Sequence, residues 1–192
     1  MRDPLPRSFY VHHAPEVARA LLGKIIVHGK TSGRIVETEA YLGAGDLAAH
    51  SARGPTPRNH VLFGPPGHAY VYFIYGMYEC LNFVAEPEGI AGCVLIRALE
   101  PLAGIEQMRT RRPAAHHLED LANGPGKLTR ALGITLRDNG ADLTRGPILV
   151  RGPEKEVAFE IASSKRVGIT KSADLPLRFF IKDNRFVSRV RI

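Results

Sequence analysis

The chain has 192 residues, of which 44% are hydrophobic and 23% are charged. That length and balance fit a folded domain with a sizeable core and exclude a disordered chain. Lysine and arginine outnumber aspartate and glutamate by 26 to 19, so the formal net charge is +7. A basic excess indicates a polyanionic partner, and nucleic acid is favoured over an acidic membrane surface.

Cysteine usage and the apolar runs indicate the cellular setting. Cys80 and Cys93 lie in apolar, strand-like stretches, and the chain has no C-x-x-C motif. They predict buried, reduced thiols without a disulfide framework or a zinc site. The N-terminus lacks the apolar segment of a signal peptide, and the run from Gly89 to Ile96 is too short to span a bilayer. We therefore expect a cytoplasmic protein, nucleoid-associated if bacterial, that engages no membrane.

Helix and strand signals alternate from the N-terminus. Pro4 and Pro6 predict an extended arm over residues 1–10, because proline blocks a helix there. A helix over 14–22 is indicated by a proline near its start and a glycine just after its end. Strands are predicted at 24–28 and 34–41, followed by a long loop at 43–58.

The middle of the chain is rich in aromatic and β-branched residues. They predict a β-hairpin with strands at 70–75 and 78–84, and a further strand at 92–98. No internal repeat or linker is found, so residues 1–192 are predicted to form a single α/β mixed domain. Helices are predicted at 101–112 and 127–132, and short strands at 148–151, 157–161, 166–169, 177–181 and 186–190.

The predicted strand at 34–41, R-I-V-E-T-E-A-Y, has two carboxylates on an apolar background. Because side chains alternate between the faces of a strand, Glu37, Glu39 and Tyr41 share one face. An edge strand with a solvated acidic face is one explanation, and a reactive site is the other. The alternation does not decide which of the two glutamates would react.

The tip of the predicted hairpin, Tyr75-Gly76-Met77-Tyr78, is apolar where soluble hairpins usually have Asn, Asp or Ser. Either another segment covers these side chains or a partner binds them. On a basic protein, the second reading is a wedge that enters the DNA minor groove and unstacks a base step. Enzymes that flip a base out of the duplex need such a wedge, because the target atom cannot be reached within the stack.

Five sequence blocks then occur in order: R-I-V-E-T-E-A-Y-L-G from Arg34, T-P-R-N from Thr56, Y-V-Y-F-I-Y-G-M-Y from Tyr70, V-L-I-R-A-L-E-P from Val94 and N-G-P-G-K-L from Asn123. Together they resemble the alkyladenine (3-methyladenine, N-methylpurine) DNA glycosylases of the α/β type. The resemblance implies a curved, largely antiparallel β-sheet with flanking helices and a protruding β-hairpin. It also implies a monofunctional glycosylase of base excision repair that acts on damaged purines in double-stranded DNA, without a cofactor or a metal.

Residue by residue, the resemblance implies that Glu39 activates the attacking water and that Arg97 helps to hold that water and the carboxylate. The chemistry agrees, because a purine alkylated at N3 or N7 is already cationic and leaves without an acid catalyst. One carboxylate beside an ordered water both stabilises the developing charge on the sugar and supplies the nucleophile. A lyase would need a lysine in the site, and we expect none there.

The other matched positions would contact the base or the DNA. Asn82 would stand in the pocket wall as a steric and hydrogen-bonding gate, and Tyr75 would fill the gap left by the flipped nucleotide. Flat side chains could sandwich the extruded base, each stack being worth about 1–3 kcal/mol. These are Tyr41, His50 and Tyr72, while Met77 and Tyr78 would lie in the groove.

Basic side chains outside the pocket are candidates for phosphate contacts. Together they predict that the affinity for DNA falls markedly with salt. The candidates are Arg53, Arg58, Arg109, Arg112 and Lys127, with Arg111, Arg185, Arg189 and Arg191 as further ones.

Two other classes of function stay open at this point. A non-catalytic minor-groove or damage-recognition protein would use the hairpin and the basic face, but it leaves Glu39 and Arg97 unexplained. A metal-dependent hydrolase would use histidines such as His12-His13 and His116-His117, yet adjacent residues of an extended segment point apart and no H-E-x-x-H motif occurs. Nothing in the sequence indicates an interface between copies, so we expect a monomer.

Overall fold

Two long strands, β2 (Thr31–Tyr41) and β5 (Cys93–Ala103), pair antiparallel in the middle of the sheet. The computed structural model describes residues 2–74 and 76–188 of the chain. Register shifts after Ser32 and on both sides of Glu37 bend β2 against β5, as β-bulges do. β1 (Ile25–His28) and β8 (Arg178–Ile181) pair with the other edge of β2. β2 is therefore an interior strand, and the reading of an edge strand with a solvated acidic face is wrong.

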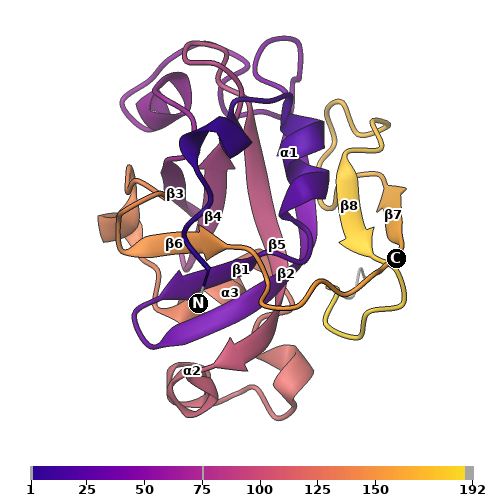
Figure 1. Ribbon diagram of the computed structural model, residues 1–192. Coiled ribbons are helices and arrows are strands. Elements are labelled where there is room, and N and C mark those ends of the chain that lie inside the picture. Colours follow the sequence, from indigo (N-terminus) through magenta and orange to yellow (C-terminus); the bar gives the residue numbers. More distant parts are fainter. Residues whose placement is uncertain (1, 75, 189–192) are drawn as a thin grey trace.

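The remaining strands extend this antiparallel pair into a curled sheet, shown in Figure 1. They are β3 (Ala69–Ile74), β4 (Tyr78–Val84), β6 (Ile148–Arg151) and β7 (Ile161–Ser164). The order along the sheet is β3-β4-β5-β2-β1-β6, and β7 pairs with β8 beside it. Every pairing is antiparallel, so the mixed α/β fold with a largely antiparallel sheet is confirmed.

Three short helices pack on the sheet: α1 (Ala14–Leu21), α2 (Ile105–Arg111) and α3 (Pro125–Leu132). α1 lies against β2, where the Thr38 hydroxyl donates a hydrogen bond of 3.0 Å to the Ala18 carbonyl. Because Thr38 lies between Glu37 and Glu39, those two side chains point to the opposite face of the strand. Within the described ranges, no helix has the length and apolar character that a bilayer crossing requires.

The main core lies between the sheet and the helices. Ile35 and Val36 of β2 are fully buried in it, together with Ile96 of β5. Cys80 and Cys93 are buried free thiols, as the sequence predicted. Four short 3-10 helices lie at Arg7–Tyr10, His60–Phe63, Leu118–Asp120 and Leu136–Asp138.

The predicted hairpin is confirmed, with β3 and β4 in register from Ala69 opposite Phe83 to Ile74 opposite Tyr78. Gly76 in the turn has a φ of 69°, a left-handed conformation that glycine adopts without strain. Tyr75, which the resemblance assigns to the gap in the duplex, lies outside the described residues.

Some predicted boundaries are wrong. The helix predicted at 101–112 begins only at Ile105, because β5 continues through Pro101 to Ala103. Gly104, with a φ of 69°, separates the strand from the helix. The N-terminal arm makes an isolated bridge from Pro4 to Arg151 but then turns into a 3-10 helix.

The C-terminal third also differs from the prediction. The strand predicted at 157–161 is wrong over residues 157–160, which are irregular, and β7 begins only at Ile161. Residues 166–169 form an irregular segment instead of a strand. The backbone amide of Val167 donates to a side chain there, and so it is not used in a strand ladder. Residues 186–188 are not a strand either, and the rest of that prediction falls outside the described residues.

Arg7 joins the N-terminal 3-10 helix to the segment before β6. Its Nη2 lies 2.7 Å from Oδ2 of Asp142. The other carboxylate oxygen of Asp142, Oδ1, accepts hydrogen bonds from the amide and the hydroxyl of Thr144. Burial acts to raise the pKa of Asp142, but the bonds from Thr144 and the Arg7 charge lower it to about 2. The pair therefore stays charged well into the acid range.

We expect Asp142→Asn to lower the free energy of unfolding at neutral pH, and the difference from wild type to shrink in acid. A carboxyl group with a pKa lowered from about 3.9 in the unfolded chain stabilises the folded state above that value. Its contribution is lost as the pH falls through about 2. Urea unfolding between pH 7 and pH 2 measures this, and a difference that is constant over the range would contradict it.

Candidate active site

Arg97 of β5 lies between the two carboxylates of β2. Its Nε donates to Oε1 of Glu37 at 2.9 Å, and its Nη1 lies 3.3 Å from Oε1 of Glu39. Both glutamates have no exposed surface, and Arg97 is 7% exposed. Burial acts to lower the pKa of Arg97, but Glu39 and Glu37 raise it above its ordinary value. The strand alternation thus places Glu37 and Glu39 on one face, as predicted, and Arg97 joins them.

Glu37 accepts four hydrogen bonds. Its Oε1 accepts from Arg97, from Nε of Arg178 at 2.7 Å and from the Ser188 hydroxyl at 2.8 Å. Its Oε2 accepts from the Ser188 amide at 2.7 Å. Removal of one partner of such a buried pair typically costs about 3–5 kcal/mol, so these bonds hold Glu37 firmly in the protein interior.

Glu39 is less completely engaged. Oε1 accepts from the Val167 amide at 2.7 Å and lies near Arg97, whereas Oε2 accepts one hydrogen bond, of 3.0 Å, from the Tyr41 hydroxyl. A carboxylate oxygen has two lone pairs, so Oε2 can accept a further bond. Arg97, Tyr41 and Val167 all line a cavity, and Glu39 lies directly behind this part of its wall.

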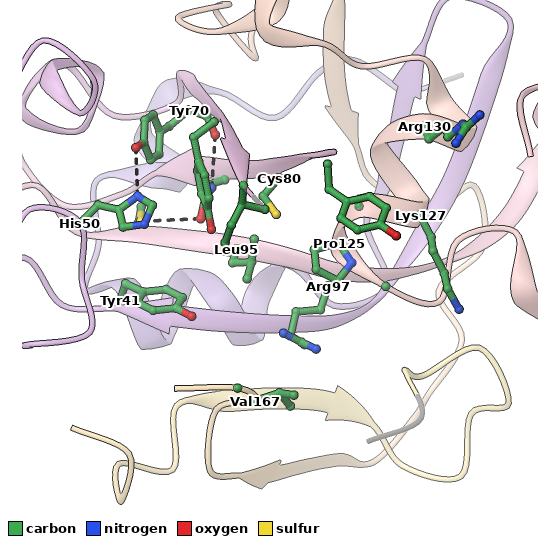
Figure 2. Close-up of a pocket in the computed structure, with 18 of the residues that line it drawn as sticks. Tyr41, His50, Tyr70, Cys80, Leu95, Arg97, Pro125, Lys127, Arg130 and Val167 are labelled. Atoms are coloured by element: carbon green, nitrogen blue, oxygen red, sulfur yellow. Dashed lines mark hydrogen bonds between the residues drawn. The ribbon is translucent and has the colours of Figure 1, made fainter. Parts of the chain in front are cut away.

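The cavity has a volume of about 720 Å³ and runs from the aromatic hairpin face to the start of α3. Figure 2 shows Tyr41 and His50 near one end, Arg97 and Val167 along the wall, and Lys127 and Arg130 near the other end. Small-molecule sites in proteins commonly have volumes of about 300–1,000 Å³. This cavity is therefore large enough for a purine base.

The aromatic end consists of rings from β2, β3 and the loop after β2. The ring centroids of His50 and Tyr72 are 4.4 Å apart, and Nδ1 of His50 lies 3.0 Å from the Tyr70 hydroxyl. The guanidinium of Arg58 lies over the Tyr72 ring at 5.5 Å. Tyr41, His50 and Tyr72 are thus brought together as the resemblance implied, and Tyr70 is a fourth ring that sequence reasoning missed.

The titratable groups of this end are held in their neutral forms. The His50 ring is partly open to solvent, and burial of the rest, followed by the Arg58 charge, lowers its pKa. Burial raises the pKa of Tyr70 to about 12, and burial and then the Glu39 charge raise the pKa of Tyr41. Burial also raises the pKa of Cys93 to about 12. A neutral aromatic lining favours a flat, weakly hydrated ligand.

Asn82 of β4 stands in the wall of this pocket, opposite Tyr70 in the hairpin register. Its side-chain amide donates to the Tyr70 carbonyl at 3.3 Å, and its Oδ1 accepts from the thiol of Cys93. The amide group is therefore fixed by its neighbours, as a steric gate would require.

The T-P-R-N block fixes the loop after β2. Asn59 donates from Nδ2 to the carbonyl of His50 at 2.8 Å, and its Oδ1 accepts from the Thr56 amide at 2.6 Å. Arg58 donates to the Phe73 carbonyl at 2.8 Å while it covers Tyr72. The block thus holds His50 and Arg58 at the aromatic end.

The opposite end of the cavity is basic. Arg112, at the end of α2, and Lys127 and Arg130, on α3, line it together. Burial, and then the charge of Arg130, lower the pKa of Arg112, which shows that these cations lie close together. Of the other predicted phosphate contacts, Arg53 and Arg109 do not line the cavity, and Arg109 pairs with Glu106.

The described part of the hairpin tip is exposed. Met77 is 63% and Tyr78 42% accessible, so the alternative that another segment covers them is wrong for these two residues. Tyr78 also lines the cavity, and a Cβ added to Gly126 would lie 2.8 Å from its ring. The glycine after Pro125 in the N-G-P-G-K-L block therefore lets the hairpin approach α3.

Sequence reasoning missed most of the partners that hold Glu37 and Glu39. Arg178, Ser188 and Val167 lie 128 to 151 positions further along the chain, and no local pattern signals such contacts. Among residues 2–74 and 76–188, no three His, Cys, Asp or Glu side chains converge as a metal site would need.

Comparison with known proteins matches almost the whole chain. The profile of the family described as Methylpurine-DNA glycosylase (MPG) matches residues 8–185. The chain belongs to this family. A relative from Methanoculleus marisnigri is 53% identical, with 96% of this chain and 98% of that protein covered. Relatives from Koribacter versatilis and Bradyrhizobium diazoefficiens are each 50% identical, and cover 98% and 97% of this chain and 94% and 91% of themselves.

All three relatives bear names that assign them to the 3-methyladenine DNA glycosylases. The protein is therefore an enzyme that hydrolyses N-glycosyl bonds, and its substrate is DNA. Membership of this family favours a glycosylase over the two alternative functions, a non-catalytic architectural protein and a histidine-based metal hydrolase.

We expect Arg58→Gln to raise the pKa of His50, because a nearby positive charge disfavours the imidazolium form. The pKa stays below the ordinary value in this variant, since burial, the larger cause, is unchanged. An NMR titration of the imidazole resonances measures the shift. Arg53→Gln, an exposed arginine of the same loop, is the control, and an equal shift in both variants would contradict the assignment.

Proposed function

We propose that this enzyme excises alkylated purines from double-stranded DNA. The damaged base is flipped into the cavity, and a water activated by Glu39 hydrolyses the N-glycosidic bond and leaves an abasic site. The single observation that supports this most is the contrast between the two buried glutamates. Glu37 is held mainly by Arg178 and Ser188, which do not line the cavity. Glu39 is held by Tyr41, Val167 and Arg97, which all line it, and its Oε2 can accept a further bond.

The chemistry of a cationic purine fits this wall. Such a base departs as a neutral molecule once its bond to the sugar breaks, so the developing positive charge on the sugar is what needs stabilisation. The ionised Glu39 would provide that stabilisation and would orient the water, with Arg97 holding the carboxylate in place. The water gives one proton to the carboxylate as its oxygen bonds to the anomeric carbon.

The aromatic end would hold the base during this reaction. Tyr41 would stack on one face of the purine, and His50 and Tyr72 would contact the other face or the edge. The faces of tyrosine rings attract a cation through their quadrupole, which favours purines alkylated at a ring nitrogen. Asn82 would exclude bases whose substituents clash with its fixed amide.

The mechanism is proposed as monofunctional. The expectation that no lysine lies in the site is wrong in one respect, because Lys127 lines the basic end of the cavity. Its Nζ donates to Oδ1 of Asn123 at 2.6 Å, on the α3 side and not beside Glu39. We therefore assign Lys127 to phosphate binding, together with Arg112, and not to a covalent step. The monomeric and nucleoid-associated states stay predictions.

The hairpin tip would open the duplex. Met77 and Tyr78 are large, exposed and next to the cavity, which is where a wedge in the minor groove must lie to stabilise a flipped nucleotide. The family resemblance assigns the gap-filling role to Tyr75, which directly precedes Gly76 in the sequence.

We expect Glu39→Gln to lower the single-turnover rate of 3-methyladenine or 7-methylguanine excision by about 10²–10⁴-fold, the range that a general base usually contributes. Affinity for the lesion duplex, measured by fluorescence anisotropy, should change little because the amide keeps the shape of the side chain.

The matched control for this experiment is Glu37→Gln. It should mainly lower the free energy of unfolding, since it removes a charge that two arginines contact, and the folded fraction should excise within about tenfold of wild type. If Glu39→Gln excises normally while Glu37→Gln does not, the roles of the two glutamates are reversed.

We expect Arg112→Gln and Lys127→Gln each to weaken DNA binding and to reduce the slope of log affinity against log salt by about 1. Each substitution removes one phosphate contact and the counterion release that accompanies it. Arg145, which is 84% exposed and pairs with Asp142 outside the cavity, is the control. A slope reduced equally by Arg145→Gln would show that only net charge matters.

A further inference from the structure

An irregular segment, residues 165–177, connects β7 to β8 and contributes Val167, Gly168 and Ile169 to the cavity wall. The amide of Val167 donates the shortest hydrogen bond that Glu39 receives, at 2.7 Å. Segments without regular pairing usually hold a backbone group less firmly than a strand does. The position of this amide therefore needs another source of rigidity.

Arg166, next to Val167, provides such a source. Its side chain and that of Asp46 have no exposed surface, and the pair is bidentate, with Nη1 2.6 Å from Oδ2 and Nη2 2.8 Å from Oδ1. Nη1 also donates to the carbonyl of Ala40 at 3.0 Å, and Nη2 donates to that of Ser172 at 3.2 Å. The Arg166 guanidinium thus joins the segment to β2 through Ala40 and to the loop after β2 through Asp46. Its bond to Ser172 lies within the segment.

Asp46 is fixed in turn by its own loop. Its carboxylate accepts from the amides of Leu42 and Ala48, each at 3.1 Å. Burial acts to raise its pKa, but the bonds from Arg166 and from these amides lower it, so the aspartate stays ionised. The loop after β2 and the segment 165–177 are therefore joined by a charged pair. Its planar, bidentate geometry permits one arrangement of the two side chains.

The same guanidinium also sits on Tyr41. Its central carbon lies 4.6 Å from the centroid of the Tyr41 ring, while neither Arg166 nor Asp46 lines the cavity. The face of the ring that Arg166 covers is therefore the face turned away from the cavity. The other face is left for a flat ligand, and the Tyr41 hydroxyl is held on Oε2 of Glu39.

We propose that Arg166, paired with Asp46, is a positioning residue for base excision, which holds the Val167 amide and the Tyr41 hydroxyl on the two oxygens of Glu39. The inference rests on the proposed role of Glu39 and extends it. Arg166 touches neither the cavity nor the bound base, and it acts through the two donors that orient the carboxylate. A displacement of about 1 Å in such a group can lower a rate by about a hundredfold.

Arg166→Lys tests this inference. Lysine keeps the charge but cannot form the bidentate pair, reach both carbonyls and cover the ring at once. We expect the single-turnover rate on a duplex with 7-methylguanine to fall by about a hundredfold. The dissociation constant for the same duplex should change less than threefold, because Arg166 contacts neither the basic end nor the hairpin tip, and a shift of Tyr41 and Val167 by about 1 Å leaves the cavity open to the base.

The chain contains a matched control. Arg7 and Asp142 form another Arg–Asp pair, at 2.7 Å, that joins distant segments away from the cavity. Arg7→Lys should lower the melting temperature but leave the excision rate within twofold of wild type. If Arg166 contributed to stability alone, both variants would have a lower melting temperature. The excision rate of each would then fall only in proportion to the fraction of protein that is unfolded.

A second variant keeps the inference testable if Arg166→Lys does not fold. Arg166→Met combined with Asp46→Asn removes the buried charges together, which proteins often tolerate with little loss of stability, and the asparagine oxygen can still accept from one of the two loop amides. This folded double variant should also lose excision about a hundredfold while it binds the lesion duplex. Excision within threefold of wild type by either folded variant overturns the inference.

Glu39→Gln in the same assay separates the two proposals. If it excises at the wild-type rate, the proposed function of Glu39 fails, and the inference fails with it. If Glu39→Gln is inactive and Arg166→Lys excises normally, the inference on Arg166 alone is wrong.

Discussion

The structure depends on the contact of Arg97 with two buried carboxylates. Glu37 and Glu39 lie on one face of β2 without exposed surface, and the burial of carboxylates is costly unless cations lie close by. Arg97 reaches both, and Arg178 of β8 adds a second cation to Glu37. The strands β2, β5 and β8 therefore meet at a balanced group of four charges. Such a group is costly to break, because any partner that is left alone is a buried, uncompensated charge.

Within this group the two glutamates have different surroundings, so one strand can both hold the sheet together and place a carboxylate beside the cavity. Glu37 accepts from the C-terminal segment and from two arginines, and so it fixes the orientation of Arg97. Glu39 is held by donors that also form the cavity wall. The packing of the sheet thus sets the orientation of Glu39, the carboxylate that we propose to be reactive.

The cavity joins two chemically different ends. Around Tyr41, His50 and Tyr72 the lining is aromatic and uncharged, which suits a flat base, whereas Arg112 and Lys127 mark a basic end that suits a phosphate. The exposed hairpin tip adjoins the cavity through Tyr78. A nucleotide has the same division between base and phosphate, so the shape and the charge of the cavity agree with the DNA substrate that the family acts on.

The sequence by itself determined the family, the mixed α/β fold and the face shared by Glu37, Glu39 and Tyr41, because strand alternation and the residue spacing within each block are local properties. It misplaced the start of the helix at Ile105, where one glycine decides between strand and helix. The resemblance selected Glu39 over Glu37, but only the tertiary structure showed how their surroundings differ, since the partners that differ lie 128 to 151 positions away. Alternation fixes the direction of a side chain, but the donors that meet it depend on how distant segments pack.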